Sequence, residues 1–242
     1  MGRKLDEFGY WLSTAICAAL VVLFIPVLVK AILFDAWGMI YAYGWEWWKD
    51  GCFIGILAGF ALYGLCTLTL KIPRVEHNLN WFMKFTHELT HTLVAVLFFA
   101  KIREFVVKDH ECYVCYKAGP IGYVPITLSP YCIPIYTFML LPFRFFGDSH
   151  YMVVFDILIA FTYAFHIHSF VRQTSGEQSD IEGCGLARSA MFITFVHMSV
   201  LSMILATPKG GVANAIIRVF WVYPKQILFQ PELWMEEVCK FL

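Results

Sequence analysis

The stretch FTHELTHTLVAVLFFA, residues 85–100, combines three ionisable side chains with a run of apolar residues. His87 and His91 lie four residues apart, and Glu88 directly follows the first histidine. Residues four apart share one face of a helix, so both imidazoles can point at one metal ion. The apolar residues that follow predict a membrane helix, in which ionisable groups are costly and rare without a function.

The composition of the whole chain favours a membrane as its surroundings. Of 242 residues, 60% are hydrophobic and 15% are charged, against roughly 25% charged residues in an average soluble protein. A formal net charge of zero and the absence of a basic run argue against nucleic-acid binding. The eight cysteines are scattered, unlike those of a secreted disulfide framework. We therefore expect a multi-pass integral membrane protein of the cell inner or cytoplasmic membrane.

Apolar segments predict an all-α polytopic membrane protein with about six transmembrane helices, at residues 8–29, 51–70, 80–100, 118–143, 151–171 and 189–208. The fourth segment contains five prolines, which predict a kinked or partly re-entrant span. β-Branched and aromatic residues alternate with polar ones at 101–126, which predicts a short β hairpin after the third helix. The last residues, about 211–242, mix apolar and charged side chains and are expected to form an interfacial segment.

The motif at residues 87–91 has the residue types and the spacing of a catalytic zinc site. Two imidazoles one helical turn apart can bind Zn2+. The Glu88 carboxylate can take a proton from the attacking water and pass it to a leaving amine. The alternative is a pair of interfacial histidines near the end of a span, with Glu88 in contact with solvent.

The sequence resembles the site-2-protease family of intramembrane zinc metallopeptidases. The resemblance is carried by the segment THELTHTL at residues 86–93, the β-rich segment with its Gly-Pro turn, and the kinked spans. The resemblance covers about residues 81–195 and implies a metallopeptidase-like core within a single membrane domain at 1–242. It also implies that His87 and His91 bind zinc and that Glu88 is catalytic. The family's third ligand is an aspartate, usually in an Asn/Pro-rich segment ending in Asp-Gly. This sequence lacks that segment in its usual form.

Two residues are the main candidates for the third protein ligand that a catalytic zinc requires. Asp180 comes just before the sixth predicted span, whereas His166 lies within the fifth. The alternatives are a loop or N-cap carboxylate at 180 and a histidine hydrogen-bonded inside the bundle at 166. Asp156, ten residues before His166 on the same span, is a further candidate. Gln178 is expected to hold the substrate backbone, as an Asn does in the family, and Tyr163 shares a face with His166 and can stabilise an oxyanion.

These patterns predict a membrane-embedded zinc-dependent endopeptidase that hydrolyses a peptide bond within or beside the bilayer. Its cofactor is Zn2+, and its substrate is a membrane protein or a peptide. The β segment after the motif can pair with an extended substrate as an added strand. The alternative is a non-catalytic metallopeptidase-like subunit of a membrane protein complex, which requires partner subunits. A transporter or channel predicts paired charges along several spans, and uncharged segments such as 51–70 do not have them.

Overall fold

The computed structural model describes residues 7–43, 51–69, 72–108, 111–146, 151–174 and 178–206, and isolated residues after 206. The interfacial segment predicted at 211–242 lies almost entirely outside the described residues. The chain is mostly helical, with one small sheet. In order, the elements are α1 (Glu7–Tyr43), α2 (Gly51–Leu68), α3 (Pro73–Leu97), β1 (Lys101–Val107), β2 (Cys112–Lys117), α4 (Pro120–Cys132), α5 (Ile135–Phe146), α6 (Met152–Gln173), α7 (Ser179–Cys184) and α8 (Leu186–Ala206).

In the described part of the chain, four helices are long and apolar enough to cross a membrane. They agree with four of the predicted spans, and their apolar stretches are Phe8–Val29, Gly51–Leu68, Met152–Gln173 and Leu186–Leu205. The bent pair α4–α5 adds a fifth if both helices form one span. Helix α3 is not among them, because the polar and charged side chains of its motif lower its hydropathy. The predicted total of six therefore stays a prediction.

The bend between α4 and α5 follows from the prolines of this segment. The two helices meet at 80°. Pro134 has no N–H with which to continue the hydrogen bonds of α4. Ile133, which precedes it, adopts an extended conformation at φ −104° and ψ 105°, as residues before proline prefer. The predicted kink at residues 118–143 agrees with this arrangement.

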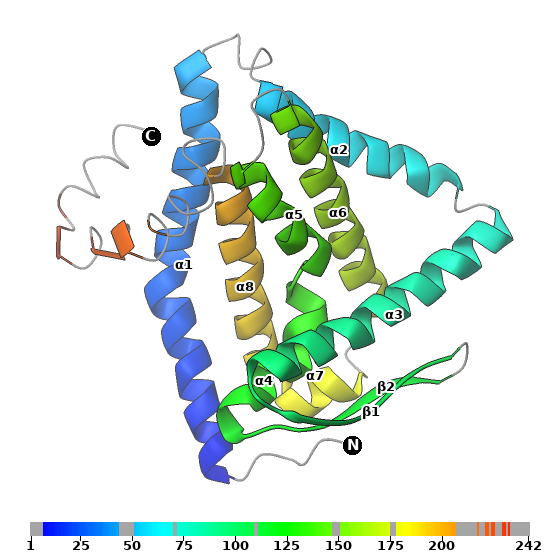
Figure 1. Ribbon diagram of the computed structural model, residues 1–242. Coiled ribbons are helices and arrows are strands. Elements are labelled where there is room, and N and C mark those ends of the chain that lie inside the picture. Colours follow the sequence, from blue (N-terminus) through cyan, green and yellow to red (C-terminus); the bar gives the residue numbers. More distant parts are fainter. Residues whose placement is uncertain are drawn as a thin grey trace.

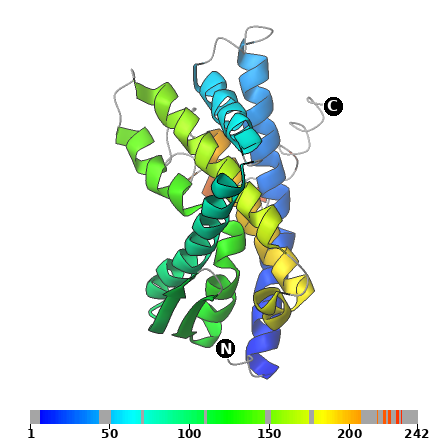
Figure 2. The same cartoon turned by 90° about the vertical axis from the view of Figure 1, so that its right-hand side faces the viewer.

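Close helix contacts hold the bundle together. The most extensive are those of α2 with α6 and of α1 with α8 (Figures 1 and 2). A Cβ atom at Gly55 or Gly59 of α2 would clash with atoms of α6. The absence of side chains at these two positions therefore lets the helices approach, as small residues do in membrane bundles.

A two-stranded antiparallel sheet lies beside α3 near the end of the bundle at which α1 begins (Figure 1). Its register pairs Lys101 with Lys117 and Val107 with Cys112, with one irregularity near Ile102. A hairpin was predicted within residues 101–126, and the strands occupy only the part up to Lys117, since α4 begins at Pro120. Among the described residues, β2 pairs only with β1, so its other edge has no partner strand.

The short helix α7 is fixed in place by a buried arginine at the start of α8. Arg188 is 2% exposed, and its Nε donates to the Cys184 carbonyl at 2.5 Å. Its Nη1 donates to Ser13 Oγ of α1 at 2.7 Å, and its guanidinium lies 4.1 Å from the centre of the Tyr10 ring. Gly185, at φ +84°, makes the sharp turn between the two helices. Helix α7 is thereby tied to both α1 and α8.

Candidate metal centre

Three side chains from two helices converge beside the hairpin. His87 and His91 come from α3, and Asp180 comes from α7. Asp180 Oδ2 lies 3.6 Å from His87 Nε2 and 3.4 Å from His91 Nε2. Around a tetrahedral zinc ion with bonds of about 2.0–2.1 Å, neighbouring ligand atoms lie about 3.3 Å apart. The two distances to Asp180 are close to that value, and all three ligand atoms lie within 4.8 Å of one another.

Hydrogen bonds on the far side of each ring orient the two imidazoles. His91 Nδ1 lies 2.8 Å from the carbonyl oxygen of Ile126, and His87 Nδ1 lies 2.7 Å from Gln173 Oε1. Both partners are acceptors, so each Nδ1 carries a proton, and Nε2 is the atom of each ring that faces Asp180. Two Nε2 atoms and a carboxylate oxygen at this spacing can share a cation between them, either a proton or a metal ion. The donor set therefore fits a divalent metal ion.

Asp180 is suited to bind a cation because it is ionised. Burial raises the pKa of its carboxyl, but the imidazoles of His87 and His91 lower that pKa by more, so it lies below its usual value. The Tyr131 hydroxyl lies 3.2 Å from Asp180 Oδ2 and can donate to it. The same hydroxyl donates a hydrogen bond to Gln178 Oε1. The carboxylate thus faces the Tyr131 hydroxyl and the Nε2 atoms of both imidazoles.

A wide cleft opens onto this group. Its volume is about 790 Å³, and Glu88, His91 and Asp180 lie in its wall. Residues 112–116 of β2 form another part of the wall, as do four residues of α7. Glu88 itself is 8% exposed. Both the hairpin and part of the candidate metal-binding group thus line one cleft.

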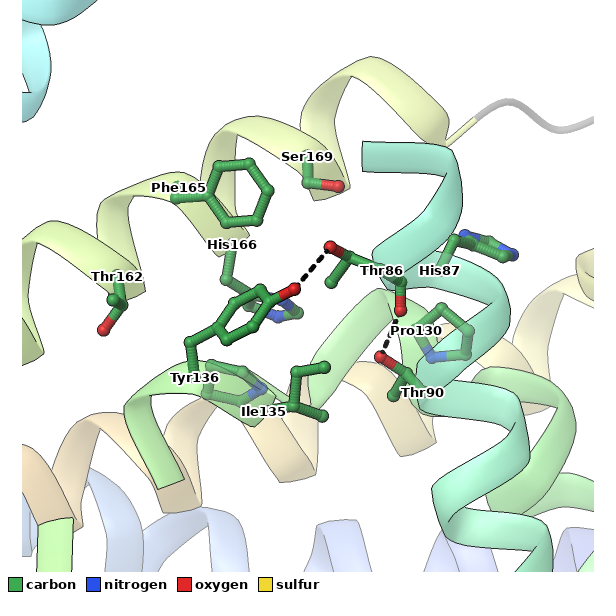
Figure 3. A pocket seen from close by; sticks show the side chains of 11 residues that line it. Thr86, His87, Thr90, Pro130, Ile135, Tyr136, Thr162, Phe165, His166 and Ser169 are labelled. Carbon is green, nitrogen blue, oxygen red and sulfur yellow. Dashed lines mark hydrogen bonds between the residues drawn. The ribbon is translucent and has the colours of Figure 1, made fainter. Parts of the chain in front are cut away.

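His166 does not belong to this group, although it lines a cavity that His87 also lines. This second, small cavity of about 10 Å³ lies between α3, α5 and α6, and in it His166 faces the hydroxyls of Thr86 and Tyr136 (Figure 3). Its side chain is buried, and its Nε2 has no hydrogen-bond partner among the described residues. Asp156 is paired with Arg144 at 2.7 Å. Of the candidates for the third ligand, the structure brings only Asp180 to the histidine pair.

The two residues predicted to contact substrate occupy different surroundings. Tyr163 is buried in a hydrophobic cluster with Leu141 and Ile159, and it lines neither the cleft nor the small cavity. The structure therefore does not bring it to the metal-binding group. Gln178 precedes α7 and accepts the hydrogen bond from Tyr131, which places it beside Asp180.

Sequence reasoning missed the residues that contact the candidate metal ligands. These are Tyr131, Gln173 and the backbone carbonyl of Ile126. A weak signal existed for Tyr131, because a phenol in the apolar, proline-rich stretch SPYCIP needs a partner for its hydroxyl. None existed for Gln173, which lies 86 residues from His87 in the chain.

Comparisons with protein-family models, curated proteins and solved structures found no match to this chain. The function is therefore argued from the residues themselves. Among the described residues, His87, His91 and Asp180 form the one group of three or more such side chains whose ligand atoms all lie within 4.8 Å of one another.

Proposed function

We propose that this chain is a membrane-embedded zinc-dependent endopeptidase that hydrolyses a peptide bond within or beside the bilayer. The observation that carries the proposal is the convergence of His87, His91 and Asp180, of which His91 and Asp180 lie with Glu88 in the wall of a wide cleft. Catalytic zinc sites have three such protein ligands and keep one position open. In this proposal α3 and the bent pair α4–α5 also enter the membrane, which with the four apolar helices makes six spans of an inner or cytoplasmic membrane.

Each residue of the centre has a role in this reaction. Bound zinc supplies a Lewis acid that polarises the scissile carbonyl and makes water more acidic. Glu88 takes the proton from the attacking water and delivers it to the leaving amine nitrogen. The hydrogen bonds of His87 to Gln173 and of His91 to the Ile126 carbonyl keep both rings in the tautomer that binds metal.

The cleft supports an extended polypeptide as the substrate. A helical segment hides its carbonyl groups in its own hydrogen bonds, so a transmembrane substrate must unwind before attack. The edge of β2 that has no partner strand belongs to the hairpin that forms part of the cleft wall. An unwound segment can pair with such an edge as an added strand, which presents its backbone to Glu88 and the metal ligands.

The test uses the full-length chain purified in detergent micelles, with fluorescein-labelled casein as an extended probe. We expect about one zinc per chain and slow release of labelled peptides. Glu88→Gln keeps zinc but lowers the cleavage rate by about 100- to 10,000-fold, the usual contribution of a general acid–base. Glu76→Gln is the matched control, because Glu76 lies on the same helix in an exposed ion pair with Arg172, and we expect its activity to equal that of the wild type.

Two outcomes would count against the proposal. If purified wild-type protein contains no zinc, the proposed metal centre is refuted. Protein that holds zinc but cleaves no extended polypeptide, with Glu88→Gln indistinguishable from wild type, is the behaviour of a non-catalytic metallopeptidase-like subunit.

A further inference from the structure

Tyr131 lies at the junction of the metal centre and the helix bundle. It is the penultimate residue of α4, and its side chain is 1% exposed. Its ring packs edge-on against the His87 ring, with centroids 5.2 Å apart and planes at 88°. Its backbone carbonyl accepts a hydrogen bond from His197 Nε2 of α8 at 2.9 Å. Backbone and ring are therefore held from two sides.

Packing alone does not explain why residue 131 carries a hydroxyl group. A phenylalanine ring would fill the same space, whereas a buried hydroxyl requires a hydrogen-bond partner. The partners of the Tyr131 hydroxyl are Asp180 Oδ2, at 3.2 Å, and Gln178 Oε1. In the described part of the chain, the side chains that contact the Asp180 carboxylate are those of His87, His91 and Tyr131.

We infer that Tyr131 is a positioning residue of the metal centre, whose hydroxyl orients the Asp180 carboxylate toward His87 and His91. The inference rests on the proposed function, because it takes Asp180 as a metal ligand. Helix α7 has only six residues, and an aspartate side chain can rotate away from its partners. A donor fixed on α4 restricts that rotation and keeps Oδ2 facing the two nitrogens. Such outer partners typically change metal affinity by about 10- to 100-fold.

Substitution of Gln178 predicts the direction in which zinc affinity should change. A tyrosine hydroxyl carries one proton, so Gln178 Oε1 and Asp180 Oδ2 compete for it. Removal of the Gln178 amide frees the hydroxyl to donate to Asp180 alone. Tyr131→Phe and Gln178→Ala are therefore expected to act differently on zinc affinity, although both break the same Tyr131–Gln178 hydrogen bond.

The experiment measures the zinc dissociation constant of full-length protein by competition with a chromophoric chelator. We expect Tyr131→Phe to weaken zinc binding by about 10- to 100-fold, and Gln178→Ala to bind zinc at least as tightly as the wild type. The visible spectrum of cobalt-substituted protein should also change in Tyr131→Phe, since it reports the ligand geometry. Tyr63→Phe is the matched control, because it removes a buried hydroxyl that bonds to His168 Nδ1 at 2.7 Å on α6, and its zinc affinity should equal that of the wild type.

The outcomes separate this inference from the function on which it rests. Wild type that binds zinc, with Tyr131→Phe within twofold of it and an unchanged cobalt spectrum, overturns the positioning role and leaves the peptidase proposal intact. Wild type without zinc overturns both. If Tyr131→Phe does not fold, Gln178→Ala decides: zinc binding as tight as or tighter than that of the wild type supports the inference, and weaker binding overturns it.

Discussion

Two pairs of histidines lie inside this bundle, and their surroundings differ. His87 and His91 each use Nδ1 on an acceptor oxygen and turn Nε2 toward the Asp180 carboxylate. His166 and His197 also lie close, with ring centroids 5.5 Å apart. Among the described residues, no carboxylate joins this second pair in a group of metal-ligating side chains. His197 Nε2 is taken by the backbone carbonyl of Tyr131, and His166 faces a cavity of about 10 Å³.

The comparison shows that two neighbouring imidazoles do not by themselves make a metal site. What distinguishes the first pair is a negative charge in front of both lone pairs, an acceptor behind both rings and a cleft of about 790 Å³ beside them. A cation bound at the second pair would have no charged partner among the described residues and no room for substrate. The first pair is therefore the one that can support chemistry.

The largest change in zinc binding is expected when a histidine of the first pair is removed. His87→Ala removes a ligand, and we expect zinc binding to weaken by more than the roughly 100-fold that loss of an outer partner can cost. His166→Ala removes a ring of the second pair and should leave the zinc dissociation constant unchanged, because His166 is not one of the clustered ligand side chains. Metal content after dialysis against a weak chelator separates the two. Equal zinc loss in both variants would show that the two pairs are not different in kind.

The next effect concerns the two candidates for the third ligand. Asp180→Ala removes the carboxylate in front of the lone pairs, so we expect loss of tight zinc. His166→Ala should keep a full complement of zinc, because the His166 ring lies outside the group. Zinc titration of both proteins checks this. The reverse result, with zinc retained in Asp180→Ala and lost in His166→Ala, would assign the third ligand to α6.

A smaller change in zinc affinity is expected when the hydrogen-bond acceptor of His87 Nδ1 is removed. Gln173→Ala deprives His87 Nδ1 of its acceptor, and we expect zinc affinity to fall by about 10- to 100-fold. Gln173→Glu is the paired variant, because a carboxylate also accepts from Nδ1–H and should restore affinity to at least the wild-type value. If both variants lose zinc equally, size or packing at position 173 is what matters and the acceptor is not.

Sequence patterns predicted part of this arrangement. Helical spacing placed His87 and His91 on one face, and the prolines of residues 118–143 predicted the bend between α4 and α5. Local patterns could not decide between Asp180 and His166, because both follow the motif by more than 70 residues. Which one reaches the histidines depends on how α7 packs, and that depends on the buried Arg188. Tyr131 and Gln173 likewise acquire their roles only through tertiary contacts.

The most direct test of the metal centre is X-ray absorption at the zinc edge of the purified wild-type protein. The account predicts about one zinc per chain, bound by two imidazole nitrogens and a carboxylate oxygen at about 2.0–2.2 Å. A chain without zinc would contradict it. A zinc coordination shell that contains sulfur would also contradict it, because sulfur would indicate Cys112 or Cys115 of the cleft wall as ligands in place of His87, His91 and Asp180.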